Sequence, residues 1–412
     1  MSWKIAHLSI HGDPLAQLGG THHGGQNVYV KEISRYLGAL GLLIDVYSRR
    51  ETPEQASYKK YSEGARVVRI PVGPAEVIQK ERILSLLPDL ASWLLNFYKE
   101  RNLNYRLLHS HYYFSGAAGI HLKQILGIPL VHTFHSLGAV KQESLGQENH
   151  SPVTRIEIER KICRAADCII ATNPQEKIDL IEKYQAPPDR IEIIPCGVNL
   201  SLFEPRDPAR AKKSIGYQPD DFLITFVGRL EKRKGIDTLL EAIALIDDPR
   251  IQAVIVGGPP VDKPFLSWSD LQQEPFKTYQ DLIEDLGLES QVTFTGGKPQ
   301  SELAKYYSAG DVTVIPSYYE PFGLTAVEAL ACGSSLIASR VGGLKSTVVE
   351  GKVGSLFEPR NPRRLAEKIK NHRDQPEMNK KYRREARPYV EEKFSWASVS
   401  KQVALLYKRL GS

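Results

Sequence analysis

The segment FLITFVGRLEKRKGIDTLLEAIALIDDPRIQAVIV, residues 222–256, decides the fold class. It starts with a short apolar run at residues 222–227, continues with a helical pattern at residues 235–246, and ends in a second β-branched run at residues 251–256. Short strands that alternate with helices are typical of parallel sheets whose two faces are covered by helices. The segment therefore predicts an α/β domain with a doubly wound sheet.

The same alternation runs along almost the whole chain. Strands are expected at residues 4–10, 42–47, 67–70, 107–110, 129–133, 168–171, 191–194, 222–227, 251–256, 292–295, 312–315 and 335–338. Helices are expected at residues 27–40, 77–99, 154–165, 174–184, 235–246 and 323–331. This order predicts parallel, Rossmann-like sheets throughout.

A break in the alternation lies near the middle of the chain. The segment at residues 195–208 is punctuated by Pro and Asp and has neither a helical nor a strand period. About twelve strands are also too many for one comfortable open sheet. We therefore expect a hinge near Leu200 between two domains, residues 1–200 and residues 201–389. The tail after Asn361 is charged and predicts helices without a strand.

Composition narrows the classes of function. The 412 residues are 42% hydrophobic and 25% charged, which is typical of a globular protein and excludes a disordered or fibrous one. The formal net charge of +6 is too small to indicate a nucleic-acid partner. No apolar stretch reaches the length of a membrane span, about 18 residues, and the first residues lack a signal-peptide pattern. Four cysteines without a disulfide or zinc spacing suit a reducing compartment. We expect a cytoplasmic protein with no membrane partner.

The loops that follow strands carry the candidate chemistry, because an open α/β sheet binds ligands beyond the carboxyl ends of its strands. The first of them, residues 9–27, is rich in glycine and precedes a helix. Gly25 and Gln26 are candidates for contacts with a phosphate or a sugar, since glycine lets backbone amides approach an anion closely. A plain flexible loop is the alternative. The nearby histidines, His22 and His23 among them, lack further ligands, so no metal is expected.

A second loop, residues 228–235, places several cations at the end of a strand. Arg229 and Lys234 are expected to bind a diphosphate, which needs two or more cationic donors in a fixed geometry. A solvated basic turn is the alternative. The chain contains no Asp-x-Asp pair that could clamp a metal–diphosphate complex. A leaving diphosphate would therefore be neutralised by these cations and by helix amides, without a metal.

A third loop, residues 316–323, precedes a helix that is apolar on nearly every side and should be buried. Glu328 interrupts this helix, and a buried carboxylate needs partners, such as the vicinal diol of a ligand. Glu320 could hold a second set of hydroxyls, and a phosphate would face the free amides of Gly323, Leu324 and Thr325. The arrangement suits a nucleotide-sugar. A structural ion pair of Glu328 is the alternative.

Further candidates lie in the first half of the chain. The runs at residues 109–112 and 132–138 end two expected strands and contain histidines, which are either cleft residues or structural ones. Three basic residues with more apolar neighbours are either ligands of an acceptor phosphate or plain surface charges: Lys80, Lys141 and Arg155.

Two of these loops carry a resemblance to a known family. Gly228-Arg229…Lys234-Gly235 and Glu320-Pro321-Phe322-Gly323-Leu324…Glu328 resemble the retaining glycosyltransferases of the GT-B fold. The resemblance covers nearly the whole chain. It implies two Rossmann-like domains facing across a cleft, with the acceptor bound by the first and the nucleotide-sugar donor by the second. It also implies that C-terminal helices cross over and return residues 390–412 to the first domain.

Two branches of this family fit. Residues 24–32, GGQNVYVKE, and residues 135–138 resemble sucrose-phosphate synthases, which transfer glucose from UDP-glucose to fructose 6-phosphate and give sucrose 6-phosphate and UDP. The runs at residues 109–112, 131–133 and 139–141 also resemble the inositol-phosphate N-acetylglucosaminyltransferases of mycothiol synthesis. That second branch typically has Met where this chain has Gln26, which favours the first. Both branches use a phosphorylated acceptor.

Carried over residue by residue, the resemblance implies the following roles. The catalytic residues would be His135, Arg229, Lys234 and Glu320. The donor would contact Gly25, His135, Arg229, Lys234, Lys298, Glu320, Phe322, Gly323, Leu324, Thr325 and Glu328. The acceptor would contact Gly25, Gln26, Lys80, Tyr112, Lys141 and Arg155. Some synthases carry a second arginine where this chain has Thr154. No cofactor or metal is expected. A nucleotide-sugar epimerase, with Asp13 as its base, is a remote alternative.

Overall fold

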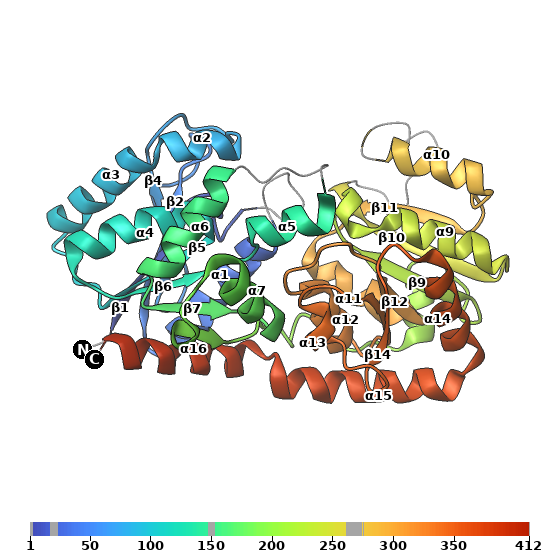
Figure 1. Cartoon of the computed structure of the whole chain (residues 1–412). Coiled ribbons are helices and arrows are strands. Elements are labelled where there is room, and N and C mark those ends of the chain that lie inside the picture. The colour runs from blue at the N-terminus through green and yellow to red at the C-terminus, as the bar shows by residue number, and fades with distance from the viewer. Residues whose placement is uncertain (1–2, 17–23, 147–152, 261–273, 275, 412) are drawn as a thin grey trace. The chain divides into compact units, whose positions relative to one another are not determined.

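The computed structural model describes residues 3–16, 24–146, 153–260, 274 and 276–411, and the chain divides into two compact units. Unit 1 comprises Met1–Cys196 and Trp396–Ser412, and unit 2 comprises Gly197–Ser395 (Figure 1). The chain leaves unit 1 just before Leu200, where the hinge is expected. Both units are α/β, which confirms the fold class that the alternation of strands and helices predicts.

Unit 1 is built on an eight-stranded sheet in the order β3-β4-β2-β1-β5-β6-β7-β8. All neighbouring strands are parallel except β3 and β4, which are antiparallel. The loops after β1, β5 and β6 therefore open at the same edge of the sheet. The strands are β1 (Lys4–Leu8), β2 (Leu43–Arg49), β3 (Tyr58–Ser62), β4 (Ala65–Ile70), β5 (Leu107–His111), β6 (Leu130–Thr133), β7 (Cys168–Ala171) and β8 (Ile191–Ile193).

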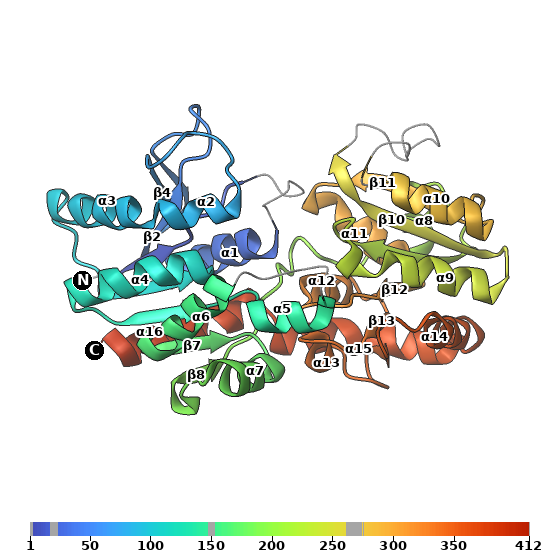
Figure 2. The same cartoon turned by 45° about the horizontal axis from the view of Figure 1, so that its top comes forward.

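Helices cover both faces of this sheet (Figure 2). On one face α4 packs against α3 and α6, and on the other α1 packs against α16. Successive residues of a strand point to opposite faces, so Leu8 joins the core beneath α4 while His7 meets Tyr407 of α16. The helices are α1 (Gly25–Ala39), α2 (Lys80–Ser85), α3 (Leu87–Glu100), α4 (Tyr112–Leu126), α5 (Gly138–Leu145), α6 (Val153–Ala165), α7 (Pro174–Tyr184) and α16 (Trp396–Gly411).

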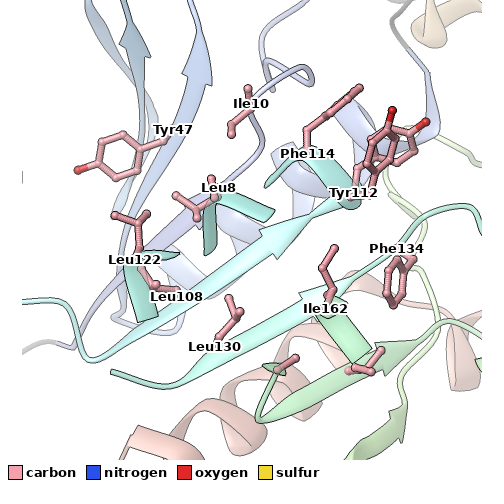
Figure 3. Packing of buried hydrophobic residues seen from close by; sticks show 14 of the residues in the cluster. Leu8, Ile10, Tyr47, Leu108, Tyr112, Phe114, Leu122, Leu130, Phe134 and Ile162 are labelled. Carbon is pink, nitrogen blue, oxygen red and sulfur yellow. The ribbon is translucent and has the colours of Figure 1, made fainter. Parts of the chain in front are cut away.

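The core of unit 1 lies between the sheet and α4 and α6 (Figure 3). Leu8, Leu108 and Leu130 come from the three neighbouring strands β1, β5 and β6. They pack with Phe114 of α4 and Ile162 of α6, and each of these side chains is at most 1% exposed. Burying a side chain of this size contributes about 1.5–3 kcal/mol. This core holds in place the ends of β1 and β5, beside which the candidate acceptor residues Gln26 and Tyr112 stand.

Unit 2 contains a six-stranded parallel sheet in the order β11-β10-β9-β12-β13-β14. Its strands are β9 (Phe222–Val227), β10 (Ile251–Pro260), β11 (Val292–Gly297), β12 (Val312–Ile315), β13 (Leu336–Ser339) and β14 (Gly354–Phe357). One helix layer joins α9 to α10 and α14, and another joins α11 to α8 and α12, with α15 against α12. The helices are α8 (Pro208–Ser214), α9 (Ile236–Ile246), α10 (Lys277–Leu286), α11 (Gln300–Ala309), α12 (Leu324–Ala331), α13 (Leu344–Thr347), α14 (Pro362–Asp374) and α15 (Pro376–Lys393).

Several elements differ from the sequence prediction, and the expected helix ranges include none for α4, α5, α8, α10, α11 or α13. Strand β3 is missed because its residues, YKKYS, are largely exposed and lack an apolar alternation. Strand β14 is missed because its residues, GSLF, begin with Gly and Ser and include only two apolar side chains. The helix expected at residues 77–99 is two helices that meet at Leu86, just before Pro88, since proline is accepted in the first turn of a helix but not in its interior. Of the helices in the described ranges, none is long and apolar enough to cross a membrane.

Candidate active site

In unit 2 the fold brings two of the expected donor loops together. Strands β9 and β12 are parallel neighbours, so the loops that follow them begin side by side. The amide of Tyr318, after β12, donates to the carbonyl of Arg233, after β9, at 2.8 Å. Gly235 has a φ of 68°, and a Cβ there would lie 2.0 Å from the carbonyl oxygen of Pro316, so only glycine fits. This close approach lets side chains from the two loops meet.

Lys234 and Glu320 form a buried ion pair between these loops. Lys234 Nζ lies 2.5 Å from Glu320 Oε2, and each residue is 9% exposed. Burial alone raises the pKa of the Glu320 carboxyl, but the charges of Lys234, Arg233 and Arg229 outweigh it, so that the pKa is lowered. Burial lowers the pKa of Lys234. The sequence predicts that these two groups bind different parts of a ligand. Here they bind each other, so a diphosphate would compete with Glu320 for Lys234.

Two arginines of the same basic run share the carboxylate of Glu231. Arg229 Nη1 lies 2.7 Å from Glu231 Oε1, and Arg233 Nε lies 2.6 Å from Glu231 Oε2. Arg233 also donates to the carbonyl of Tyr319 at 3.3 Å. Arg233 is not among the predicted residues, although it stands in the same basic run as Arg229 and Lys234. Three cations then face two carboxylates, and this excess of positive charge suits an anionic ligand.

The N-terminus of α12 adds backbone donors beside Glu320. Gly323 caps the helix with a φ of 94°, a conformation that favours glycine. The amide of Ala326 makes the first hydrogen bond of the helix, to the carbonyl of Gly323 at 2.9 Å. The amides of Leu324 and Thr325 precede that bond and carry the partial positive charge of a helix N-terminus. An anion placed there would be stabilised by these amides.

Glu328 lies in the buried middle of α12 and is 7% exposed. Tyr307 donates its hydroxyl to Glu328 Oε2 at 2.9 Å, and Gln300 donates its amide to Oε1 at 3.4 Å. Because neither partner is charged, burial dominates and raises the pKa of Glu328 to about 7. The alternative of a structural ion pair is therefore wrong for the residues that the structure describes. A carboxylate held in this way can accept hydrogen bonds from a diol.

The surroundings of Glu320 are closely packed. A further glycine loop, which sequence analysis misses, follows β13 and contains Gly342 and Gly343. The amide of Gly343 donates to the carbonyl of Glu320 at 3.1 Å, and a Cβ at Gly342 would lie 2.1 Å from that oxygen. Phe322 is buried with its ring 6.0 Å from that of Phe394, between ring centres. Consecutive glycines after an expected strand were the signal that could have found this loop.

In unit 1 the described part of the first loop leads into the first turn of α1. Gln26 Nε2 donates to Ser9 Oγ at 3.2 Å, which holds the amide beside the end of β1. Asn27 accepts a hydrogen bond from the amide of Gly24 at 3.0 Å and so closes the turn at the start of the helix. Gly25 is the exposed first residue of α1. Gly25 and Gln26 therefore stand at a carboxyl strand end, where ligands of open α/β sheets bind.

Arg155 is 6% exposed and paired within its own helix, so the alternative of a surface charge is wrong. Its Nε donates to Glu159 Oε1 at 2.7 Å, and its Nη2 donates to the carbonyl and hydroxyl of Ser136 at 2.9 and 3.0 Å. Arg155 and Glu159 are four residues apart on α6, a spacing that the sequence alone displays. An acceptor phosphate would have to share Arg155 with this carboxylate.

Two residues with left-handed backbone stand at the ends of β5 and β6. Tyr112 follows β5 with a φ of 70°, and His135 follows β6 with a φ of 61°. Such values are uncommon outside glycine and concentrate at functional sites. Arg155 connects the two positions, because its guanidinium carbon lies 5.1 Å from the centre of the Tyr112 ring and its Nη2 binds Ser136. The structure thus places Arg155 against Tyr112 and against Ser136, the residue that follows His135.

The histidines of β5 are core residues. The run ends a strand as predicted, since His111 is the last residue of β5, and His109 and His111 are both completely buried. Donor atoms of His7, His109 and His111 lie within 4.8 Å of one another, as in a candidate metal site. Both ring nitrogens of His109 are already hydrogen-bonded, to Tyr407 at 2.5 Å and to Thr133 at 2.9 Å. The cluster is therefore better described as a hydrogen-bonded part of the core.

The remaining predicted residues carry less structural information. Lys80 is the first residue of α2, but its side chain lies outside the described residues, as do His22 and His23. Lys141 is half-buried on α5. Lys298 is half-buried directly after β11, at the carboxyl edge of the sheet of unit 2. Their roles stay predictions.

Comparison with known proteins assigns both units. The family described as Glycosyltransferase Family 4 matches residues 23–202, and the family described as Glycosyl transferases group 1 matches residues 208–388. A D-inositol 3-phosphate glycosyltransferase of Corynebacterium glutamicum (strain R) is 34% identical, over 98% of this chain and 96% of its own. One of Thermomonospora curvata is 35% identical, over 90% of this chain and 88% of its own.

Solved structures agree with this assignment. A sucrose-phosphate synthase from Thermosynechococcus elongatus has a TM-score of 0.90 and 35% identity, covering 99% of both chains. Anabaena HepE, solved in complex with UDP-glucose, has a TM-score of 0.75 and 20% identity, covering 99% of this chain and 100% of its own, and supports the fold alone. Two family matches in succession and relatives that span nearly the full length show that the chain is an enzyme of the GT-B glycosyltransferases.

Proposed function

We propose that this glycosyltransferase transfers glucose from UDP-glucose to fructose 6-phosphate with retention of configuration, giving sucrose 6-phosphate and UDP. The observation that carries the donor half is the buried pair of Lys234 and Glu320 beside the N-terminus of α12. This arrangement places hydrogen-bond donors for a diphosphate next to a carboxylate that can accept hydrogen bonds from sugar hydroxyls. The acceptor half is supported by the Thermosynechococcus sucrose-phosphate synthase and by Gln26, which stands where the other branch typically has Met.

The donor roles follow from the charges of unit 2. The diphosphate binds Arg229, Lys234 and the first amides of α12. When Lys234 turns to the diphosphate, the carboxylate of Glu320 is released from its ion pair and accepts hydrogen bonds from glucose hydroxyls. Glu328 accepts the two hydroxyls of the ribose, in place of its weak bond to Gln300. Ligand binding thus exchanges contacts within the site for contacts with the substrate.

The reaction is a displacement on the same face of the sugar. The bond between the anomeric carbon and the β-phosphate oxygen breaks, and the sugar acquires oxocarbenium character. The acceptor hydroxyl attacks from the face that UDP leaves, and its proton passes to the departing β-phosphate. Arg229 and Lys234 stabilise the growing charge on UDP, an effect whose loss typically costs about 3–4 kcal/mol. No step requires a metal, so activity should withstand EDTA.

Transfer of N-acetylglucosamine from its UDP derivative to D-inositol 3-phosphate is the second candidate. It is favoured by the curated relatives of Corynebacterium and Thermomonospora, which carry that acceptor in their names. Both acceptors are phosphorylated, and Arg155 with Tyr112 suits either. An epimerase is disfavoured, because Asp13 is fully buried in an ion pair with Arg69 at 2.6 Å and is not an open base.

An assay of UDP release separates these functions. The enzyme is incubated with UDP-glucose alone, with UDP-glucose and fructose 6-phosphate, and with UDP-N-acetylglucosamine and D-inositol 3-phosphate, each with and without EDTA. We expect release in the second mixture, unaffected by EDTA, and an α-configured glucosyl product by NMR. Release only in the third mixture would overturn the proposed acceptor in favour of the second candidate. An epimerised donor without acceptor would overturn transfer altogether.

A further inference from the structure

His135 is bound by a second histidine from the neighbouring strand. His111 Nδ1 lies 3.1 Å from His135 Nε2, a hydrogen-bond distance. Strands β5 and β6 are in parallel register with His111 opposite Thr133, which places the two rings at adjoining strand ends. The ring of Tyr29 packs edge-on against both imidazoles, with centroid distances of 5.7 Å to His111 and 5.0 Å to His135. The register of the two strands and the packing of Tyr29 therefore both hold the two rings in this arrangement.

Both imidazoles of this pair are neutral at neutral pH. Burial, with the neighbouring histidines, lowers the pKa of His111 well below its ordinary value. Burial also lowers the pKa of His135 to about 3. A neutral imidazole carries hydrogen on one ring nitrogen and leaves the other bare. One hydrogen therefore lies between the two rings, and the direction of this bond decides which nitrogen of His135 carries its own hydrogen.

The other ring nitrogen of His111, Nε2, decides which of the two histidines donates the hydrogen bond. His111 Nε2 is buried and has no hydrogen-bond partner among the described residues. In proteins a buried N–H group without an acceptor is rarer than a buried acceptor atom without a donor. Such an N–H group loses the hydrogen bond that it makes with water in the unfolded chain. The hydrogen of His111 therefore belongs on Nδ1, where it has a partner. His111 donates, and His135 Nε2 accepts.

The same rule places the hydrogens of the adjoining network without conflict. His7 Nδ1 is buried without a partner, so His7 carries its hydrogen on Nε2 and donates to the hydroxyl of Tyr407 at 3.0 Å. Tyr407 then donates to His109 Nδ1 at 2.5 Å. His109 carries its hydrogen on Nε2 and donates to Thr133 Oγ1 at 2.9 Å. The ring N–H groups of His7 and His109 and the hydroxyl of Tyr407 thus each find an acceptor.

We propose that His111 is a positioning residue that holds His135 in the tautomer with hydrogen on Nδ1. His135 then offers a substrate one hydrogen-bond donor, suited to a hydroxyl oxygen of a sugar, and cannot accept a proton at Nε2 without breaking the pair. The inference rests on the proposed function insofar as His135 contacts a sugar substrate. The tautomer itself is a property of the protein and can be measured without substrate.

Nuclear magnetic resonance tests the tautomer directly. The full-length protein is labelled with ¹⁵N-histidine, and two-bond correlations between ring protons and nitrogens show which nitrogen of each ring carries hydrogen. The spectrum of His135→Asn identifies the signals of His135. We expect a protonated Nδ1 and a bare Nε2 for His135, and the same protonation for His111. A protonated Nε2 on His135 would overturn the proposal.

Three variants separate positioning from simple packing. His111→Asn keeps an N–H donor where Nδ1 lies, and His111→Leu removes it. His132→Leu is the matched control, because His132 is an equally buried histidine of β6 whose Nδ1 binds Ser110 instead. We expect His111→Leu to lower kcat about tenfold with little change in the KM for UDP-glucose, and His111→Asn to restore most of it. His132→Leu should lower the melting temperature similarly but spare kcat.

The outcomes remain distinguishable. Equal loss of kcat in His111→Asn and His111→Leu, or in His132→Leu, would refute positioning by His111. If the wild-type enzyme releases UDP with neither acceptor, the proposed function fails, and the NMR spectrum of the wild type still decides the tautomer. If a leucine variant does not fold, the same spectrum keeps the proposal open to refutation.

Discussion

The raised pKa of Glu328 predicts that the affinity for UDP-glucose increases with pH. The folded enzyme holds this carboxyl with a pKa of about 7, because it is buried with only Tyr307 and Gln300 as hydrogen-bond partners. A ribose diol donates two hydrogen bonds and therefore binds the ionised form. About one tenth of Glu328 is ionised at pH 6 and about nine tenths at pH 8, so the affinity should rise about tenfold over this range.

Isothermal titration calorimetry with UDP-glucose at pH 6, 7 and 8 measures this effect. UDP-glucose is preferable to UDP, whose terminal phosphate itself titrates near pH 6. Glu328→Gln keeps the shape of the side chain and the contact with Tyr307 but cannot ionise. It should bind UDP-glucose weakly and equally at each pH. A flat affinity in the wild-type enzyme, or the same slope in Glu328→Gln, would refute the assignment of Glu328 to the ribose.

The same carboxyl links stability to pH. Its pKa is 4.5 in the unfolded chain and about 7 in the folded one, so between these values the folded state binds more protons. Stability from this group is therefore present below pH 4.5 and is lost as the pH rises to 7, by about 3 kcal/mol in total. Urea unfolding should find Glu328→Gln more stable than the wild type at pH 8 and similar to it at pH 5 or below. An equal difference at both pH values would contradict this reasoning.

Further substitutions test the other groups of the site. Arg229→Ala should lose about 2–4 kcal/mol of transition-state stabilisation, measured as kcat/KM. The control Arg250→Ala should lose none, because the side chain of Arg250 is 81% exposed. Unchanged turnover in Arg229→Ala would contradict the role of Arg229. Lys234→Met should reduce the free energy of unfolding by about 3 kcal/mol, because it leaves the buried carboxylate of Glu320 without a cation. Adding Glu320→Gln should restore most of this free energy, as measured by urea titration. No recovery in the double variant would argue against the pair. Gln26→Met should raise the KM for fructose 6-phosphate and leave that for UDP-glucose unchanged; the reverse pattern in steady-state kinetics would remove Gln26 from the acceptor site.

Local pattern accounts for most of the secondary structure. The strands β7, β9 and β12 and the helix α7 begin and end at the predicted residues, because each is a clear apolar or amphipathic run bounded by turn residues. Strand β3 is not predicted because an exposed edge strand has no buried face and therefore no alternation of apolar and polar residues. The positions of the glycine-containing loops at carboxyl strand ends also follow from the order of elements alone.

Only some of the side-chain contacts could be predicted from the sequence. The pair of Arg155 and Glu159 could be predicted, since a spacing of four residues on a helix brings two side chains together. The bonds of Lys234 to Glu320 and of Tyr307 to Glu328 could not, because they join loops and helices far apart in the chain.

The sequence by itself therefore determines the α/β class, the two-unit division and the residue types available at the strand ends, since these depend on periodicities within a few turns of chain. Only the tertiary structure decides that Glu328 is held by uncharged groups and that His111 faces His135. Both depend on strand order, on register and on burial, and burial also sets the pKa values that govern the chemistry of the site.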